Sequence, residues 1–406
     1  MVVAVILLSK DTDPLARVCA VPVIVRLLRA LHNANIRDIV VLNGEYAENI
    51  RELIGSGEEL GLNIRYNLEG VTAEKFLVLT SRVLVDEKLI EELAKSEPNT
   101  IFITKNNGEE ILVGALIESG KINEIKALFE NDGEEKVLGD LINVVYVNQI
   151  KVYYPHLRRH LNLLAIPVRN DKERKRAAKV LVARTQKGLH IFGSINRYFE
   201  NAVVRLVCNC SWITPNRVTI LSNITAYLMA LLFTLQKPFL AIIMGFVTAI
   251  LDGVDGKLAR VRGIGTKLGE IEHSFDMLYE QVIYVAWIYY VYTITNSLWI
   301  LIMGFIFLVS DTFTRHVYMQ FKMSTGKNLL LMSRIDRIIA KIDGRRNMWF
   351  FYMLIGILTK PYYGLILMLV HSLATSTVYI TRAIYHLRRM DKEEGTKAWL
   401  NVIYNK

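Results

Sequence analysis

Hydrophobic and polar positions follow two different patterns along the chain. Up to about residue 150, short apolar runs rich in β-branched residues alternate with amphipathic segments whose apolar residues recur at helical spacing. Strands are predicted at 2–8, 38–43, 63–66, 75–80 and 101–104, and helices at 22–34 and 47–55. This alternation is typical of a parallel sheet with crossover helices, so an α/β domain of Rossmann type is predicted here.

Beyond Arg217 the pattern changes to long windows with hardly any charge. A helix needs about 20 apolar residues to cross the roughly 30 Å hydrocarbon core of a bilayer. Six windows are candidates, near 217–235, 237–255, 273–295, 297–319, 348–359 and 362–386. The fifth window is short and is expected to be tilted, broken or partly buried. We therefore expect an all-α six-helix transmembrane bundle to follow the α/β domain.

Between these two parts lies a strongly charged run, 168–176, followed by an amphipathic segment, 195–210, that is expected to lie in the membrane interface. The predicted organisation therefore has four parts. They are a cytosolic domain at 1–168, a charged connector with a juxtamembrane helix at 169–212, the bundle at 213–390 and a cytosolic tail at 391–406.

Charge and cysteine content refine this picture. The chain of 406 residues has a formal net charge of +10, and its basic residues cluster in alternate loops between the apolar windows. The positive-inside rule then predicts a cell-membrane protein with both termini cytoplasmic. The basic balance favours contact with anionic membrane lipids or phosphate over nucleic acid. Three cysteines without further ligands nearby indicate neither a disulfide framework nor a zinc site.

Acidic residues at the ends of two apolar windows are the candidate chemistry. Asp252 and Asp255 are three residues apart, and Glu272 and Asp276 are four apart, so each pair shares a helical face. Four carboxylates at such positions would repel one another unless a divalent cation neutralised them. The pattern therefore predicts a metal site. The alternative is that Asp252 and Asp255 are helix-end acids that face water or bond to nearby arginines.

The run Asp252-x-x-Asp255-Gly256-x-x-Ala259-Arg260, followed after eight intervening residues by Gly269, resembles the signature of the CDP-alcohol phosphotransferase family. Thr214-Pro215-Asn216-x-Val218-Thr219 resembles the usual start of its first span. The resemblance implies a six-helix membrane enzyme that moves a phosphoryl-alcohol group from a CDP-alcohol to an acceptor hydroxyl and releases CMP. It implies metal binding by the acids, and nucleotide binding by Asn216, Thr219, Gly256, Ala259, Arg260 and Gly269.

The second half of the signature departs from the family pattern. Counting strictly from Gly269 lands on His273 and Met277 instead of two acids. A shift of one residue gives Glu272 as the third metal ligand and Asp276 as both ligand and general base. The opposite shift, to Asp276 and Glu280, needs three extra residues and stays open.

Other polar residues near the windows have two interpretations each. Asp311 with Arg315 four residues later is predicted to be a structural ion pair, and the alternative for Asp311 is a role in substrate binding. Arg345 and Arg346 either hold a substrate phosphate or satisfy the charge rule. His273 is either a packing residue or a member of the substrate site. The aromatic run 349–352 is expected to form an interfacial belt.

The first part of the chain resembles the sugar-phosphate nucleotidyltransferases, on residues 21–31 and 36–42. Members of that family have a glycine-rich loop after the first strand, and here the loop 9–15 has no glycine. Thr80-Ser81-Arg82 places a cation where the family has a metal-binding aspartate. We therefore expect this domain to be catalytically silent.

Together these features predict a CDP-alcohol phosphotransferase that uses Mg²⁺ or Mn²⁺ in phospholipid or polar-headgroup synthesis. The resemblance implies a donor such as CDP-diacylglycerol, CDP-archaeol or a CDP-polyol, and an acceptor such as inositol phosphate, glycerol phosphate or serine. It also implies a homodimer. The domain order resembles bifunctional enzymes that make CDP-inositol and then di-inositol phosphate. The alternative is an inactive membrane scaffold of the same fold, whereas a transporter would show internal repeats that the sequence lacks.

Overall fold

The structure is a computed structural model that describes residues 2–9, 12–42, 46–106, 108–121, 143–187, 190–263, 265, 268–393, 395 and 403. The side chains at 121, 192, 268–270, 272 and 273 are outside this description. The chain divides into two compact units that are interleaved along the sequence. The first contains Met1–Lys187, Asn201–Ile213 and Lys257–Ile264, and the second contains Gly188–Glu200, Thr214–Gly256 and Gly265–Lys406.

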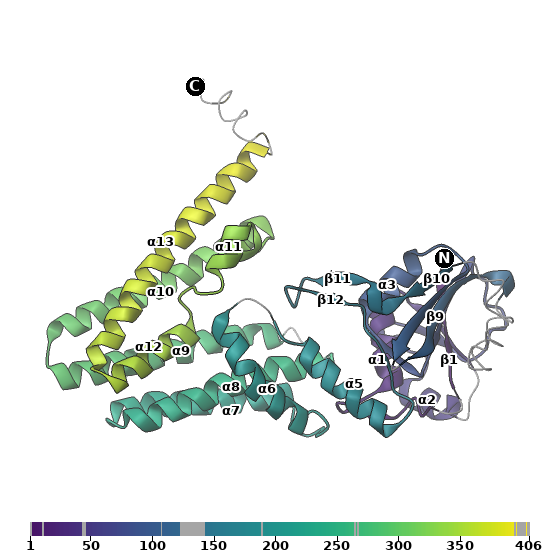
Figure 1. The fold of residues 1–406 in the computed structure, drawn as a ribbon, viewed down its shortest axis with the longest axis horizontal. Helices are drawn as coiled ribbons and strands as arrows, with labels where there is room; N and C mark the ends of the chain where they lie inside the picture. The colour runs from purple at the N-terminus through teal and green to yellow at the C-terminus, as the bar shows by residue number, and fades with distance from the viewer. Residues whose placement is uncertain are drawn as a thin grey trace. The chain divides into compact units, whose positions relative to one another are not determined.

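The first unit is built on a seven-stranded sheet (Figure 1). Its strand order is β10 (Asn143–Tyr146), β8 (Thr100–Asn106), β9 (Glu109–Glu118), β6 (Lys75–Thr80), β1 (Val2–Leu7), β4 (Asp38–Leu42) and β5 (Asn63–Arg65). All neighbours are parallel except β9, which is antiparallel to both β6 and β8. The predicted parallel α/β domain is therefore confirmed, with one antiparallel strand that the sequence pattern did not indicate.

Helices and short strands complete the first unit. The helices are α1 (Val23–Asn33), α2 (Ala47–Ile54), α3 (Glu87–Lys95) and α5 (Asp171–Arg184), with short 3₁₀ turns at Glu58–Leu60, Ser119–Lys121 and Val147–Gln149. Two-stranded pairs are β2 (Arg17–Val18) with β3 (Val21–Pro22), β7 (Val83–Val85) with β13 (Ala165–Pro167), and β11 (Lys151–Tyr154) with β12 (Arg159–Asn162).

The sheet separates two apolar clusters because successive residues of a strand point to opposite faces. Ala4 and Ile6 of β1 pack in a cluster with Leu27 and Leu31 of α1. Val3 and its neighbours on the other face form a second cluster. Helix α1 thus forms because its apolar positions recur at helical spacing and cover one face of the sheet.

The second part of the chain is helical. Its helices are α6 (Ile191–Val207), α7 (Pro215–Thr234), α8 (Pro238–Arg262), α9 (Leu268–Thr295), α10 (Leu298–Thr325), α11 (Arg334–Ile339), α12 (Arg346–Leu358) and α13 (Pro361–Glu393), with a 3₁₀ turn at Leu329–Leu331. Within the described residues, α7, α8, α10 and α13 are long and apolar enough to cross a membrane. The chain is therefore a membrane protein with four candidate spans. The count of six stays a prediction, because α12 has only 13 residues and α9 carries several acids.

Large side chains fill the interior of the second unit. Helix α7 packs against α9, and α10 and α12 pack against α13 (Figure 1). Phe233, Trp287, Phe307 and Trp349 are fully buried there. The expectation of an interfacial aromatic belt is therefore wrong for Trp349, whose ring packs edge-on against Phe307 in the core.

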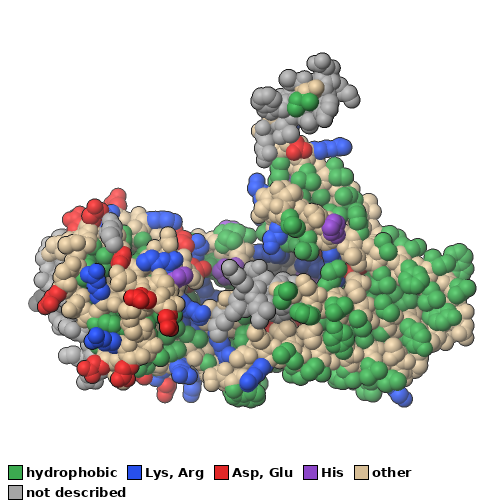
Figure 2. Space-filling view, turned by 180° about the vertical axis from the view of Figure 1, so that it is seen from behind, with side chains coloured by type: hydrophobic (Ala, Val, Ile, Leu, Met, Phe, Trp, Pro, Cys, Tyr) green, Lys and Arg blue, Asp and Glu red, His purple; other side chains and the backbone are tan. Residues whose placement is uncertain are grey.

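The outward faces of these helices are apolar. Figure 2 shows hydrophobic side chains over most of the visible helical surface, whereas the α/β domain displays acidic and basic groups side by side. Phe305 is 61% exposed and Val309 is 70% exposed, both on α10. Such exposure would be costly in water and is expected of side chains that face lipid.

Candidate active site

The start of α7 positions the first side chain of the site. Thr214 is the N-cap, and its side chain accepts a hydrogen bond from the backbone N–H of Arg217, with Pro215 in the first helical turn. Thr219 follows just over one turn into the helix. Its hydroxyl lies 3.0 Å from Oδ2 of Asp255 on α8 and donates to that carboxylate. The start motif and the acidic motif are thus in direct contact.

Asp252 and Asp255 lie on α8 and are held by donors from three other helices. Asp252 accepts a hydrogen bond of 3.1 Å from the Tyr279 hydroxyl on α9 and one of 2.9 Å from Nη1 of Arg346 on α12. The Nη2 group of Arg346 bonds to the second oxygen of Asp252, so the pair is bidentate. Protein groups thus engage both acids, and metal binding by them stays a prediction.

Arg345 and Arg346 lie in different environments although they are adjacent in sequence. Arg346 contacts Asp252 and also approaches Glu280, with 3.6 Å between Nη1 and Oε1. Arg345 instead pairs with Asp343, with 2.7 Å between Nη2 and Oδ2. Of the two candidate phosphate-binding arginines, only Arg346 is seen to contact the acidic motif.

Glu280 connects this site to a second buried ion network. Its carboxylate pairs with Arg315 and accepts a hydrogen bond of 3.3 Å from Tyr284. Nε of Arg315 in turn lies 2.9 Å from Oδ2 of Asp311. This confirms the predicted ion pair between Asp311 and Arg315. Buried charges of this kind need such partners, because each alone would be strongly destabilising in an apolar interior.

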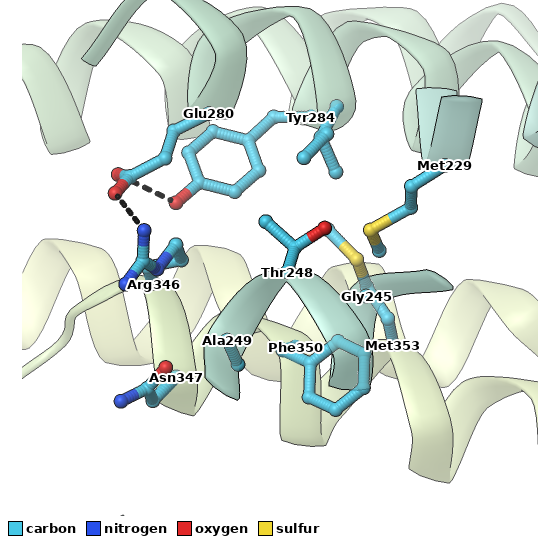
Figure 3. A pocket seen from close by; sticks show the side chains of 11 residues that line it. Met229, Gly245, Thr248, Ala249, Glu280, Tyr284, Arg346, Asn347, Phe350 and Met353 are labelled. Atoms are coloured by element: carbon cyan, nitrogen blue, oxygen red, sulfur yellow. Dashed lines mark hydrogen bonds and ion pairs between the residues drawn. The ribbon is translucent and has the colours of Figure 1, made fainter. Parts of the chain in front are cut away.

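A small cavity of about 20 Å³ lies beside Glu280 and Arg346 (Figure 3). Charged and polar groups line one end, and the ring of Phe350 and other apolar side chains line the opposite end. Gly245 permits this close packing, since a Cβ there would come within 2.4 Å of the Phe350 ring. The cavity therefore has charged and polar side chains directly beside apolar ones.

Glu200 is a carboxylate at this site that the sequence pattern did not single out. It is only 6% exposed, and it lies against Gly253 of α8, between the two aspartates. A Cβ at Gly253 would come within 2.5 Å of Glu200 Oε1. The only sequence signal was a glycine beside an acid on an apolar helix, which also fits many structural roles.

The remaining predicted residues are described to different extents. Asp276 is partly exposed and lies on α9 one turn before Glu280. Gly269, Glu272 and His273 are on α9, but their side chains fall outside the described residues.

The predicted nucleotide-binding residues lie on α7 and α8. Asn216 is exposed in the first turn of α7. On α8, Gly256 and Ala259 follow the acids, and Nε of Arg260 donates to the carbonyl of Thr185 at 3.0 Å.

The acids of the motif have the chemistry of metal ligands. Asp252, Asp255 and Asp276 are hard oxygen donors of the type that Mg²⁺ and Mn²⁺ prefer, so the chemistry of the donor set fits. Among side chains that the structure describes, no three acids, histidines or cysteines lie close enough together to hold an ion. The Glu272 side chain lies outside the described residues, so binding of an ion by all four acids stays a prediction.

Comparison with known proteins identifies the helical region. Residues 212–379 match the model of the CDP-alcohol phosphatidyltransferase family. The resemblance inferred from the signature is thereby confirmed. The bifunctional IPC transferase and DIPP synthase of Thermococcus kodakarensis is 31% identical over 135 residues. These residues make up 32% of this chain and 30% of that protein, so the chain matches less than a third of its relative's length.

Two solved structures show weaker likenesses. A phosphatidylinositol phosphate synthase of Mycobacterium tuberculosis with CDP-DAG bound is 20% identical, covering 45% of this chain and 92% of that one, with a TM-score of 0.36. A putative glucose-1-phosphate thymidylyltransferase of Bacillus anthracis is 13% identical, covering 44% of this chain and 95% of that one, with a TM-score of 0.33. At these scores neither likeness informs the geometry of the site.

Proposed function

We propose that this protein transfers a phosphoryl-alcohol group from a CDP-alcohol to an acceptor hydroxyl and releases CMP. The observation that carries the proposal is the acid pair Asp252 and Asp255 inside the segment that matches the model of the transferase family. Thr219, Tyr279 and Arg346 each donate to one of these carboxylates. A pair of intramembrane acids oriented from three sides is costly to maintain and is expected where chemistry requires it.

The residues that would hold Mg²⁺ or Mn²⁺ are Asp252, Asp255, Glu272 and Asp276. When bound, the ion would neutralise the pyrophosphate of the donor and the charge that develops on CMP. Glu280, the alternative fourth acid, is already paired with Arg315 and Arg346, which supports the assignment of Glu272 instead.

The remaining roles follow from position. Asp276 lies on the turn of α9 beside Tyr279, which contacts Asp252, so it is suited to accept the proton of the acceptor hydroxyl. Gly256 leaves room for the nucleotide on α8, and Arg260 can meet a phosphate. We assign nucleotide binding to Asn216, Thr219, Gly256, Ala259, Arg260 and Gly269, and substrate binding to His273, Arg345 and Arg346.

The α/β domain is proposed to be catalytically silent in nucleotidyl transfer. Arg82 occupies the position at which the resemblance to the sugar-phosphate nucleotidyltransferases implies a metal-binding aspartate. Its Nε lies 2.6 Å from the hydroxyl of Ser9, in the loop where a phosphate cradle would be needed. The presence of this arginine in the loop supports the proposal that the domain lacks the first reaction of the bifunctional enzymes, the synthesis of CDP-inositol.

The setting of the reaction is also a proposal. The donor is a CDP-alcohol such as CDP-diacylglycerol, and the acceptor is a polar alcohol such as inositol phosphate, glycerol phosphate or serine. Both termini would be cytoplasmic, and the protein would function as a homodimer in the cell membrane, in contact with anionic lipids.

The function is tested by measuring CMP release from a panel of CDP-alcohols while Mn²⁺ is titrated against the purified full chain. We expect Asp252→Asn and Asp255→Asn to abolish release. Asp391→Asn, which alters an exposed acid in the last turn of α13, is the control and should retain full rates.

A catalytically inactive scaffold is the competing function. The bidentate contact between Arg346 and Asp252 favours it, because a guanidinium can neutralise the acid without a metal. If no donor yields CMP at any Mn²⁺ concentration, the scaffold is the better assignment. If release is observed and Asp252→Asn does not reduce it, the chemistry lies elsewhere in the chain.

A further inference from the structure

A second cavity, of about 180 Å³, lies within the first unit. Its wall is formed by α1, the start of α3, the turn between β11 and β12, the end of α5 and the last residues of α8. We call it the arginine cavity because it is lined by Arg26, Arg29, Arg184, Arg260 and Arg262. Apart from Arg260, none of these residues has a role in the proposed transfer reaction.

The arginine cavity has an excess of positive charge. Within the described part of the chain, five guanidinium groups and two carboxylates line it, the latter from Asp86 and Glu87. Asp86 is already engaged by Arg184 at 3.2 Å, by the Tyr154 hydroxyl at 2.5 Å and by a backbone N–H. Burial raises the pKa of Asp86 above its usual value, which weakens it further as a counter-charge.

Capping of α8 accounts for part of this arginine cluster. Arg26 donates to the carbonyl of Val261 at 2.7 Å, and Arg29 donates to the carbonyl of Arg262 at 2.8 Å. These carbonyls lie at the C-terminal, electronegative end of α8, where cations are stabilising. This cap uses two of the five arginines. The others also contact protein groups: Arg184 pairs with Asp86, Arg260 donates to the carbonyl of Thr185, and Arg262 donates to the carbonyls of Cys208, Cys210 and Ile213. Backbone carbonyls carry no net charge, so these contacts leave the positive charge of the cluster largely uncompensated.

Two of these arginines also have a donor that no described protein group accepts from. Nε of Arg26 is buried and, among the described residues, has no hydrogen-bond partner. Nε of Arg262 is in the same situation within that part of the chain. Burial lowers the pKa of Arg26 to about 10, as expected for a cation that lacks a nearby anion.

We propose that the arginine cavity binds a phosphate dianion, either as free phosphate or as the phosphate group of a small ester. Guanidinium groups bind phosphate oxygens in a bidentate manner, and several in one wall select a doubly charged anion over chloride. The cavity, of about 180 Å³, is smaller than the roughly 300 Å³ at which drug-sized ligand pockets begin, which suits a phosphate group or a small ester. Bound phosphate would bridge α1 to the end of α8.

The test uses the purified full chain in detergent. Its thermal unfolding midpoint is measured with phosphate and with sodium chloride at the same ionic strength, and the affinity for phosphate is measured by calorimetric titration. Phosphate is expected to raise the midpoint more than chloride does. Arg29→Gln should weaken phosphate binding about tenfold, the size expected for one charge-assisted contact.

Arg37→Gln is the matched control. Arg37 also donates to a backbone carbonyl, that of His32 at 2.8 Å, but it does not line the arginine cavity. It should leave phosphate affinity unchanged. If Arg29→Gln folds poorly, Arg29→Lys keeps the charge without the bidentate geometry and should show a smaller loss of affinity.

Three outcomes would overturn the proposal. One is equal stabilisation by phosphate and chloride. Another is that Arg29→Gln lowers the midpoint by the same amount with and without phosphate, which is the result expected of a helix cap alone. The third is that Arg346→Gln abolishes phosphate binding while Arg29→Gln does not, which would place the anion at the transferase site.

A second titration, with glycerol phosphate, distinguishes free phosphate from a small phosphate ester as the ligand. Tighter binding than inorganic phosphate identifies a small ester as the ligand, and equal binding identifies free phosphate. Either result supports a dianion site, provided that Arg29→Gln weakens both ligands. The proposal does not depend on transferase activity, so failure of one does not imply failure of the other.

Discussion

The Thr219 hydroxyl connects the start of α7 to Asp255 through one hydrogen bond, and this contact can be removed without a large change in volume. Thr219→Val should lower the rate of CMP release about tenfold, because a hydrogen bond to a charged group contributes roughly 1.5–3 kcal/mol. We expect the requirement for Mn²⁺ to rise as well, since the Asp255 carboxylate would lose the donor that orients it.

Thr377→Val is the matched control for this change. The hydroxyls of Thr219 and Thr377 each lie within hydrogen-bonding distance of the carbonyl four residues earlier in their own helix. Thr377, however, is exposed on α13 and makes no cross-helix hydrogen bond to a described residue. Equal losses in the two variants would mean that the effect comes from the helix backbone and not from Asp255.

At the same scale, the buried position of His190 should make the protein less stable at low pH. Its side chain is 10% exposed, and burial lowers its pKa below the usual value, although Asp343 Oδ1 is only 3.9 Å away. The folded state therefore favours neutral histidine. This contribution to stability is complete above about pH 6.5, the usual value in the unfolded chain, and is lost as pH falls from there toward the lower folded-state pKa.

The measurement is the thermal unfolding midpoint between pH 7.5 and 5. His190→Gln should show a shallower decline than the unmodified chain, because it removes the group that must take up a proton on unfolding. His160→Gln alters an exposed histidine of β12 and should keep the original slope. Identical slopes in all three proteins would contradict the assignment.

Individual contacts differ in how far the sequence could predict them. The pair of Asp311 and Arg315 was predictable because a four-residue separation on a helix fixes the distance between side chains. The pair of Asp252 and Arg346 was not, since 94 residues separate them and their contact depends on how α8 and α12 pack. Sequence therefore identified the acids of the site but not their main cationic partner.

At the scale of elements, α11 is attached to α13 through one buried acid. Asp336 accepts hydrogen bonds from Nε of Arg382 at 2.6 Å, and it lies 2.8 Å from Nε2 of His386. Arg382 also reaches the hydroxyl of Ser333, the N-cap of α11, at 3.0 Å. Since α11 has only six residues, we infer that it depends on these contacts more than on its own helical stability.

Arg382→Gln should therefore destabilise the protein by about 2 kcal/mol and make 329–339 accessible to protease, because Asp336 would remain buried without its cation. Arg389→Gln on the same helix removes only an exposed pair with Glu393, which contributes well under about 1 kcal/mol. Limited proteolysis and thermal unfolding of both variants test this. Protection of 329–339 in Arg382→Gln would show that other contacts hold α11.

The sequence predicted elements well where one local pattern determines them. Four of the six apolar windows are helices long enough to span a membrane, and the first strands and helices were placed to within one or two residues. It did not predict β9, whose pairing is antiparallel and includes a close approach at Gly114. A Cβ at that position would come within 2.8 Å of the carbonyl of Val78, so the glycine reflects a neighbouring strand and not a local signal.

At the scale of the whole molecule, two segments far along the chain pack with the α/β domain. Residues 201–213, which precede the first apolar window, and 257–264, which lie between the second and third, belong to the first unit. Arg262 donates to the carbonyls of Cys208, Cys210 and Ile213, which holds these segments together. Composition indicated a change from mixed to apolar sequence, but it could not show these long-range contacts.

Cys19 and Cys208 provide a chemical test of this arrangement. Their sulfur atoms are 2.8 Å apart although 189 residues separate them in sequence. Contact with Cys19 lowers the pKa of the Cys208 thiol, and Arg262 lowers it further, so Cys208 is the better nucleophile of the two. Diamide, which takes up two electrons and two protons, should convert the two thiols into one disulfide with a mass loss of two hydrogens.

The disulfide would require the sulfur atoms to approach by only about 0.8 Å, given a bond of about 2.05 Å. We expect nearly complete cross-linking, detected by mass spectrometry and by faster migration on a non-reducing gel. Cys210→Ser should leave the cross-link intact, whereas Cys208→Ser should abolish it. A cross-link between Cys19 and Cys210, or none at all, would show that 201–213 does not pack on the α/β domain. The cross-link is therefore a direct test of which segments make up the first unit.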